Sequence, residues 1–185
     1  MLESLGALVT EGKLRHIGVS NETTWGIAQW LRIAEAKGLP RLVSVQNEYN
    51  LTRRQFDLDM AELSYHEAVG LLAYSPLAGG LLTGKYQNGV VPAGSRGDYQ
   101  KSFWRYNEHS EVATAAYLDI AARHGLHPAQ MAIAFTLTRP FTTASIIGAT
   151  SIEQLAVAIG AAEVTLSPAV LAEIDAVHRR YPRPI

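Results

Sequence analysis

The sequence predicts an α/β fold: half of a TIM barrel, a (β/α)4 unit with parallel strands and an extra C-terminal helix. Three observations predict it. Short apolar runs begin at residues 14, 41 and 69, at a nearly constant spacing. A segment with helical periodicity separates each run from the next, and this alternation is typical of a parallel sheet. A fourth run ends the series, whereas a complete barrel of this type has eight strands and about 250 residues.

The predicted elements follow from periodicity and stop signals. In the first helix Leu2, Leu5, Leu8 and Val9 share one face, and Gly12 suits its end. The predicted strands span 14–19, 41–46, 69–74 and 144–148. The other predicted helices span 23–37, 54–68, 107–124, 128–138 and 151–162, and a last helix begins at Ser167-Pro168. We expect a loop over 86–106, in which Trp104 either touches a ligand or covers the open end of the barrel.

Composition narrows the class of protein. The chain has 185 residues, of which 48% are hydrophobic, so we expect one ordered domain over 1–185. A net charge of −1 favours neither nucleic acid nor a membrane surface as a partner. Cysteine is absent, which excludes disulfides and thiolate metal sites and fits a cytoplasmic location. The N-terminal residues do not resemble a signal peptide.

A sheet of four parallel strands has two free edges, which invite another chain to pair with them. Free edges and an exposed inner apolar face predict a homodimer of two such units, or pairing with a missing N-terminal half.

Polar residues follow the predicted strands where parallel βα folds place their ligands. They are Ser20-Asn21, Gln46-Asn47, Tyr74-Ser75 and Gly148-Ala149-Thr150, and none is an acid. The set favours a ligand cradle over an acid–base site. Each residue has a structural alternative: Asn21 as a helix cap, Gln46 as a partner of a nearby loop, Tyr74 as core, and Thr150 with Glu153 as a capping box.

The stretch 69–85, VGLLAYSPLAGGLLTGK, runs from a strand into a loop of small residues. Gly79, Gly80 and Gly84 allow backbone N–H groups to converge on an anion, and Lys85 adds a positive charge. The segment therefore predicts a phosphate-bearing ligand with Tyr74 as a flat face beside it; the alternative is a strand followed by a plain glycine-rich turn. A P-loop is disfavoured, because Tyr86 occupies the position of the magnesium-binding hydroxyl residue. The six histidines show no metal-binding spacing.

Four ordered motifs, GKLRHIGVSN, SVQNEYN, LLAYSPLAGGLLTGKY and IIGATSIEQL, resemble strand-end motifs of the aldo-keto reductases. The likeness is to the C-terminal half of that barrel, in the bacterial and potassium-channel-β-subunit-like branch. It implies binding of NADP(H), with NAD not excluded.

The resemblance also implies a role for each site residue. Ser20, Asn21 and Gln46 would bind the nicotinamide carboxamide region, and Tyr74 would stack on the ring. The pyrophosphate and nearby ribose would be held by Ser75, Pro76, Leu77, Ala78, Gly79, Lys85 and Arg96. Gly148, Thr150 and Gln154 would approach the adenosine 2′-phosphate. Val157 and Ala158 depart from the family pattern near the adenine, which bears on the preference for NADP over NAD.

The family's catalytic Asp, Tyr, Lys and His belong to the N-terminal half, so no residue of this chain is assigned a catalytic role. The resemblance implies the NADP(H)-binding half of an NADPH-dependent aldehyde or ketone oxidoreductase, without catalysis on its own. The alternative is a truncated or designed half-barrel that forms a structural dimer and binds no cofactor.

Overall fold

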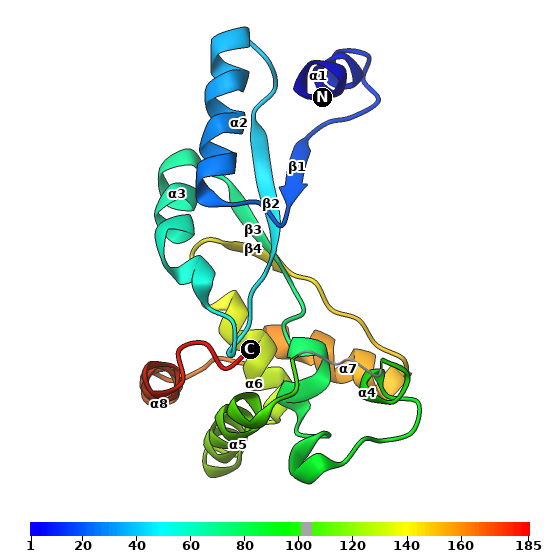
Figure 1. The fold of residues 1–185 in the computed structure, drawn as a ribbon, viewed down its shortest axis with the longest axis vertical. Coiled ribbons are helices and arrows are strands. Elements are labelled where there is room, and N and C mark those ends of the chain that lie inside the picture. Colours follow the sequence, from blue (N-terminus) through cyan, green and yellow to red (C-terminus); the bar gives the residue numbers. More distant parts are fainter. Residues whose placement is uncertain (101–104) are drawn as a thin grey trace.

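The sheet has four parallel strands in the order β1-β2-β3-β4 (Figure 1). The computed structural model describes residues 1–100 and 105–185, so Trp104 lies outside the described residues. The strands are β1 (Ile17–Ser20), β2 (Leu42–Glu48), β3 (Gly70–Tyr74) and β4 (Thr142–Ser145). All four were expected from the sequence, but β4 begins and ends earlier than predicted.

The helices follow the predicted order, but the helix predicted over 54–68 begins only at Asp59. They are α1 (Leu2–Thr10), α2 (Thr24–Lys37), α3 (Asp59–Glu67), α4 (Arg96–Tyr99), α5 (Glu108–Arg123), α6 (Pro128–Leu137), α7 (Ile152–Gly160) and α8 (Pro168–Arg180). Short 3-10 turns are η1 (Gln55–Asp57), η2 (Ala78–Thr83), η3 (Gln87–Gly89) and η4 (Ala161–Glu163). The short helix α4 lies in the region that was expected to be a loop.

Local signals explain the main helix boundaries. Thr23 caps α2, its side chain accepting a hydrogen bond from Gly26 N–H, and Gly38 ends the helix with φ 60°. Pro128 opens α6, and Ser167 caps α8 by accepting from Val170 N–H. These signals lie within a few residues of each boundary, which is why the sequence reveals them.

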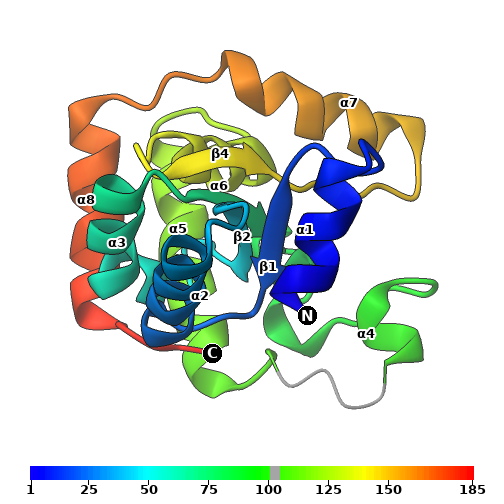
Figure 2. The same cartoon turned by 90° about the horizontal axis from the view of Figure 1, so that it is seen from above.

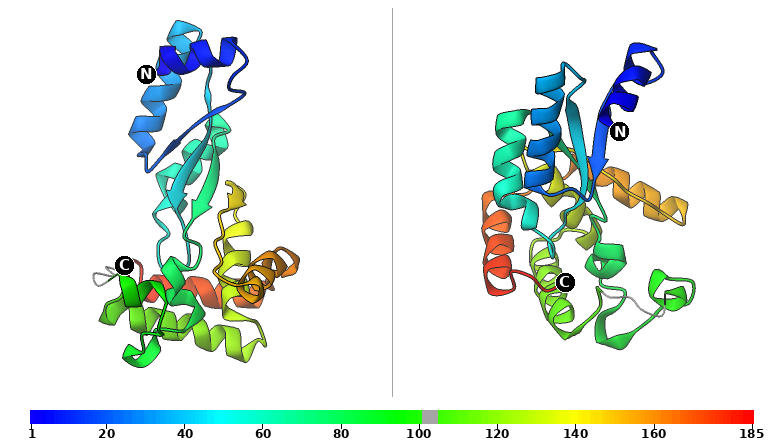
Figure 3. Two further views of the ribbon diagram at one scale, coloured as in Figure 1. Left: turned by 90° about the vertical axis from the view of Figure 1, so that its right-hand side faces the viewer. Right: turned by 45° about the horizontal axis from the view of Figure 1, so that its top comes forward.

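The molecule is elongated, with its two ends built differently. Figure 3 shows the blue N-terminal helix at one end and the green and red helices at the other. Figure 1 shows α2 and α3 along one side of the sheet, with α5, α6 and α8 beyond the carboxyl ends of the strands. Seen from above, α7 runs along the margin of the molecule away from α3 and α8 (Figure 2).

The two faces of the sheet differ in chemistry. Val45 and Leu71 are paired in register and fully buried, in one core cluster with Ile27 and Leu31 of α2. The adjacent row consists of Gly18, Ser44 and Gly70, also in register. A Cβ on Gly18 would lie 2.5 Å from Ser44 Oγ, so the serine side chain leans across the glycine. The prediction of an apolar inner face is therefore wrong for this row, which consists of two glycines and a serine.

Both edge strands, β1 and β4, have a strand neighbour on one side only. In the described part of the chain no single helix is long and apolar enough to span a membrane. One bent helix pair, Ile152–Glu163 with Pro168–Arg180, passes that test when its members are taken together.

Candidate functional site

The carboxyl ends of β1 and β2 are joined at one carbonyl oxygen. Ser20 is the register partner of Gln46. Both Ser20 Oγ and Asn21 N–H donate hydrogen bonds to the Gln46 carbonyl, each at 3.0 Å. Gln46 is half-buried, while Ser20 and Asn21 are exposed. These three predicted site residues therefore form one bonded group that a ligand can reach.

Tyr74 joins this group from β3. Its hydroxyl donates to Asn21 Oδ1 at 2.8 Å, across 53 residues of sequence. Asn21 has φ 53°, a left-handed conformation that asparagine tolerates better than most residues. The cap of α2 is Thr23, so the alternative reading of Asn21 as a helix cap is wrong. Tyr74 is half-buried rather than core, and its ring lies at the same edge as Ser20 and Gln46.

An acid lies at this edge as well, contrary to the sequence expectation. Strand β2 continues to Glu48, the register partner of Tyr74. The Glu48 side chain is 5% exposed and pairs with Arg105 Nε at 2.9 Å and Arg53 Nε at 3.7 Å. With two guanidinium partners this carboxylate is a structural anchor. Glu48 lies in the motif SVQNEYN. The sequence analysis did not include it among the strand-end residues because the strand was predicted to end at residue 46.

The loop after β3 turns sharply at Ser75 and again at the glycines. Ser75 (φ 53°), Ala78 (φ 49°), Gly79 (φ 70°) and Gly80 (φ 104°) all adopt positive φ. Ala78 N–H donates to the Ser75 carbonyl at 2.9 Å, and Gly80 N–H to the Leu77 carbonyl at 2.8 Å. Pro76 and Ala78 are buried, so the turn is packed against the body of the protein. The loop is thus an ordered, tightly wound segment.

Lys85 folds back over this turn. A Cβ on Gly80 would lie 2.7 Å from Lys85 Cε and 3.0 Å from Nζ, so the lysine side chain passes close over Gly80, whose φ of 104° favours glycine. Lys85 Nζ also lies 5.2 Å from the ring centroid of Tyr86. The structure therefore holds a cation directly above the glycine-rich turn, as phosphate recognition requires.

Tyr86 connects this loop to α4. Its ring is 2% exposed, and its hydroxyl accepts a hydrogen bond from Gly97 N–H at 3.1 Å. Burial tends to raise the pKa of Tyr86, but the Gly97 N–H and the nearby Lys85 outweigh it and lower that pKa. The contact brings Arg96, the residue before Gly97, to the same side of the molecule as Lys85. Arg96 itself is exposed.

The segment after β4 is bonded differently. Gly148, Thr150 and Gln154 are all exposed. Thr150 donates to Gln154 Oε1 from both its N–H and its Oγ1, each at 3.1 Å. Ser151 caps α7, accepting from Gln154 N–H, so the capping box predicted for Thr150 and Glu153 is wrong. Among the described residues, these three make no hydrogen bond to Ser20, Asn21, Gln46 or Tyr74.

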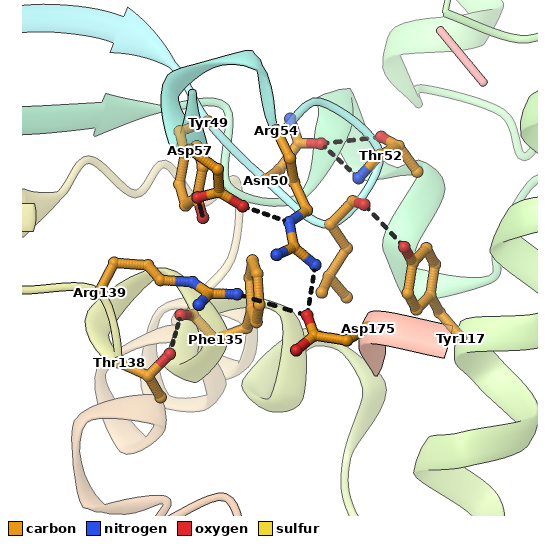
Figure 4. Close-up of polar contacts among 11 residues, drawn as sticks. Tyr49, Asn50, Thr52, Arg54, Asp57, Tyr117, Phe135, Thr138, Arg139 and Asp175 are labelled. Atoms are coloured by element: carbon orange, nitrogen blue, oxygen red, sulfur yellow. Dashed lines mark hydrogen bonds and ion pairs between the residues drawn. The ribbon is translucent and has the colours of Figure 1, made fainter. Parts of the chain in front are cut away.

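The segment 49–57, here called the β2–α3 loop, is buried behind the site (Figure 4). Arg54 pairs with Asp57 at 2.6 Å and with Asp175 of α8 at 2.8 Å, and it lies over the Phe135 ring at 5.0 Å. Burial and the Asp57 charge raise the pKa of Tyr49, whose hydroxyl donates to Asp57. A tyrosine that is buried and bonded in this way is a poor proton donor to any ligand.

No cluster of three or more metal-ligating side chains occurs in residues 1–100 and 105–185. His127 caps α6, its Nδ1 accepting from Ala129 N–H, and His124 pairs with Glu173. Both histidines therefore have structural partners.

Comparison with known proteins adds independent information. A family model described as "Aldo/keto reductase family" matches residues 1–179. "Protein tas" of Escherichia coli is 49% identical over 184 residues, covering 99% of this chain and 53% of that protein. An "Aldo-keto reductase" of Babesia bovis is 34% identical, covering 100% of this chain and 68% of that protein. A "Putative voltage-gated potassium channel subunit beta" of Schizosaccharomyces pombe is 33% identical, covering 92% and 52%. The chain thus spans about half the length of the first of these relatives.

Proposed function

This chain belongs to the aldo/keto reductase family, and from that premise we propose that it is the NADP(H)-binding part of a carbonyl oxidoreductase. The observation that carries the proposal is the group of Ser20, Asn21, Gln46 and Tyr74 at one sheet edge. The main-chain carbonyl of Gln46 accepts from Ser20 Oγ and Asn21 N–H, and the Tyr74 hydroxyl donates to Asn21 Oδ1, so these bonds orient the side chains of Ser20, Asn21 and Tyr74. Such preorganisation is what a site needs to orient a cofactor.

In the proposed function the amide and hydroxyl groups of Ser20, Asn21 and Gln46 bind the nicotinamide carboxamide. Tyr74 offers its half-buried ring as the surface on which the nicotinamide stacks. The cofactor supplies a hydride for transfer to the carbonyl carbon of an aldehyde or ketone. The contribution of this chain is to bind the cofactor and to fix which way its ring faces.

The pyrophosphate and the adjoining ribose are assigned to residues Ser75 to Gly79, with Lys85 and Arg96. The lysine folded over Gly80 supports this assignment, since it brings a positive charge to the turn. The N–H groups of Ala78, Gly80 and Gly84 donate to carbonyls within the loop rather than converging on an anion. Gly148, Thr150 and Gln154 are assigned to the adenosine 2′-phosphate. These three residues are exposed, and the assignment to NADP rather than NAD rests on the family pattern. Val157 and Ala158 differ from that pattern near the adenine, so NAD is the alternative cofactor.

We assign no general acid to this chain. Tyr49 and Tyr117 are buried and hydrogen-bonded, and burial raises the pKa of both. The catalytic tetrad that the family resemblance implies belongs to the other half of the barrel. Carbonyl reduction by this chain alone is therefore expected to be negligible, and reduction of 4-nitrobenzaldehyde at ordinary enzyme rates would contradict the proposal.

The partner is proposed to be another four-stranded unit. The free edges of β1 and β4 are satisfied together if two copies pair about a twofold axis parallel to the strands, each β1 beside the other copy's β4. An N-terminal half of the family barrel would satisfy the same edges. Sedimentation velocity over a range of concentrations separates the two. A dimer supports the second copy, and a monomer at every concentration rejects it in favour of the N-terminal half.

The main experiment is a titration of NADPH followed by its fluorescence, with NADH in parallel. We expect a saturating blue shift with NADPH. Tyr74→Ala should weaken binding by about tenfold, because base or ring stacking on an aromatic contributes roughly 1–3 kcal/mol. Tyr65→Ala is the matched control, since Tyr65 is 83% exposed and lies on α3, outside the site. No change of NADPH fluorescence with the unaltered chain would reject cofactor binding and favour a structural dimer.

A further inference from the structure

We propose that Asn50 is a positioning residue that sets the conformation of the loop after β3, and through it the affinity for the cofactor. The effect on cofactor affinity rests on the function proposed above, whereas the effect on the loop conformation does not. Asn50 is fully buried, and its Nδ2 donates to the Ser75 carbonyl at 3.0 Å. It belongs to the β2–α3 loop, so the contact joins segments 25 residues apart.

Ser75 is the residue at which the loop leaves β3. Its φ of 53° places a non-glycine residue in the left-handed region, which costs energy and needs support from its surroundings. Its carbonyl oxygen accepts two hydrogen bonds, from Asn50 Nδ2 and from Ala78 N–H. Both of these bonds hold the turn that leads into Ala78, Gly79 and Gly80. Loss of the Asn50 bond removes the one that comes from outside the loop.

An asparagine side chain fits the two demands of this position. Asn50 Oδ1 accepts from Thr52 N–H at 2.9 Å and from Thr52 Oγ1 at 2.8 Å. On the other side the Ser75 carbonyl can only accept, so it requires a donor. One group must therefore present an acceptor to Thr52 and a donor to Ser75, which a carboxylate cannot do.

The loop that carries Asn50 is itself fixed to three helices (Figure 4). Tyr117 of α5 donates its hydroxyl to the Leu51 carbonyl at 2.9 Å. Arg54 is held by Asp175 of α8 and lies over Phe135 of α6. Asn50 thus transmits the rigidity of these helices to Ser75, the first residue of the packed turn that follows β3.

The test compares Asn50→Asp with Thr52→Val in the full 185-residue chain. Asn50→Asp keeps the acceptor for Thr52 but sets a charged oxygen against the Ser75 carbonyl and beside Glu48 Oε1, to which Asn50 Nδ2 also donates at 3.4 Å. Asn50→Ser, which adds no charge and is too short to reach the Ser75 carbonyl, is therefore measured in parallel. Thr52→Val removes a hydrogen bond to the same Asn50 side chain and leaves the bond to Ser75 intact. Thr52 is 1% exposed, so both substitutions are made in buried surroundings and both are expected to lower stability.

Two measurements separate positioning from mere stabilisation. Hydrogen–deuterium exchange under native conditions should rise about tenfold or more in a peptide covering 75–84 for Asn50→Asp, and stay near the unaltered rate for Thr52→Val. NADPH affinity should fall about tenfold for Asn50→Asp only, because the loop then loses the hydrogen bond that fixes Ser75 from outside and keeps only the bond from Ala78 N–H. Equal loop exchange and equal affinity in the two variants would overturn the inference.

The outcomes also separate this inference from the proposed function. If the unaltered chain binds no NADPH, cofactor binding is rejected, and loop exchange alone decides whether Asn50 positions Ser75. If Asn50→Asp does not fold, Asn50→Ser alone decides the loop exchange and the affinity. Loop exchange and affinity at the unaltered values in Asn50→Ser would overturn the inference equally.

Discussion

Two segments of this chain follow the carboxyl end of a parallel strand, and they are built in opposite ways. In the β2–α3 loop Tyr49, Asn50, Leu51 and Thr52 are each no more than 1% exposed. In segment 146–151, after β4, Ile146 is 39% exposed and Gly148, Ala149 and Thr150 are exposed. Residues of α5, α6 and α8 contact the first segment. The second segment runs along the margin of the molecule (Figure 1).

The contrast shows where a ligand would meet preformed structure. The β2–α3 loop supports Ser75 and, behind it, the turn proposed for the pyrophosphate. After β4, Thr150 and Gln154 bond each other, and Gln154 N–H also donates to Ser151 Oγ, so these contacts stay within 150–154. We therefore expect the nicotinamide end of the cofactor to be gripped by rigid groups, and the adenosine end to order its own site. The predictions below test this difference, from the largest expected effect to the smallest.

Arg54→Leu should cause the largest loss. Its side chain is 7% exposed, and removing it leaves Asp57, which is 21% exposed, without its guanidinium partner, while Asp175, 42% exposed, keeps Arg139 at 3.7 Å. The loss is therefore expected near the lower end of the range for a buried ion pair broken from one side, about 3 kcal/mol. Arg123→Leu is the control, since Arg123 is 50% exposed and pairs with Asp119 and Glu173 at the surface, where such pairs are worth about 0–1 kcal/mol. Urea unfolding measures both, and equal losses would show that the β2–α3 loop is no more rigid than the surface.

Tyr117→Phe should have the next largest effect. The substitution removes the buried hydroxyl and leaves the Leu51 carbonyl without that donor. A loss of about 1–2 kcal/mol is expected in urea unfolding. Tyr65→Phe removes an exposed hydroxyl and should change stability by less than about 0.5 kcal/mol. An unchanged midpoint in Tyr117→Phe would mean that the loop does not depend on α5.

Ser151→Ala tests the other segment. Ser151 caps α7, so its loss should cost about 1 kcal/mol. Thr150→Ala should cost less, because Thr150 bonds only the exposed Gln154 side chain and is not the cap. A larger loss in Thr150→Ala than in Ser151→Ala would restore the cap assignment that the sequence suggested.

The smallest effect should be a dependence on pH through His178 of α8. Burial lowers the pKa of His178 below 6.5, and the positive charges of Arg54 and Arg139 lower it further. The carboxylates of Asp57 and Asp175 raise it, but by less. The unfolded chain therefore binds the proton first, so stability present above pH 6.5 is lost as the pH falls below it.

His178→Gln should flatten this dependence, measured as the urea midpoint against pH from neutral to mildly acidic. His109→Gln, an exposed position at the start of α5, is the matched control and should leave the curve unchanged. A curve that keeps its slope in His178→Gln would assign the dependence to other groups.

Much of the fold follows from local sequence signals. Apolar runs predicted all four strands, and helical stripes predicted the long helices. Thr23 and Gly38 mark the two ends of α2, and Ser167 marks the start of α8, through hydrogen bonds made within one turn. The position of the candidate site could be predicted, because the carboxyl ends of the strands of a parallel sheet meet at one edge. That is why Ser20, Gln46 and Tyr74 could be named together.

What the sequence by itself determined is the order of the elements and the residues that reach the carboxyl edge, since both depend on neighbours a few positions away. The choice of Ser151 over Thr150 as the cap of α7 is local, a choice between two adjacent hydroxyl residues. Tertiary structure alone decided that β2 extends to Glu48 and that Asn50 supports Ser75. Both depend on groups distant in the chain, since Arg105 pairs with Glu48 and Ser75 lies 25 residues from Asn50. A pattern in one segment carries no information about which remote side chain will satisfy a buried donor or charge.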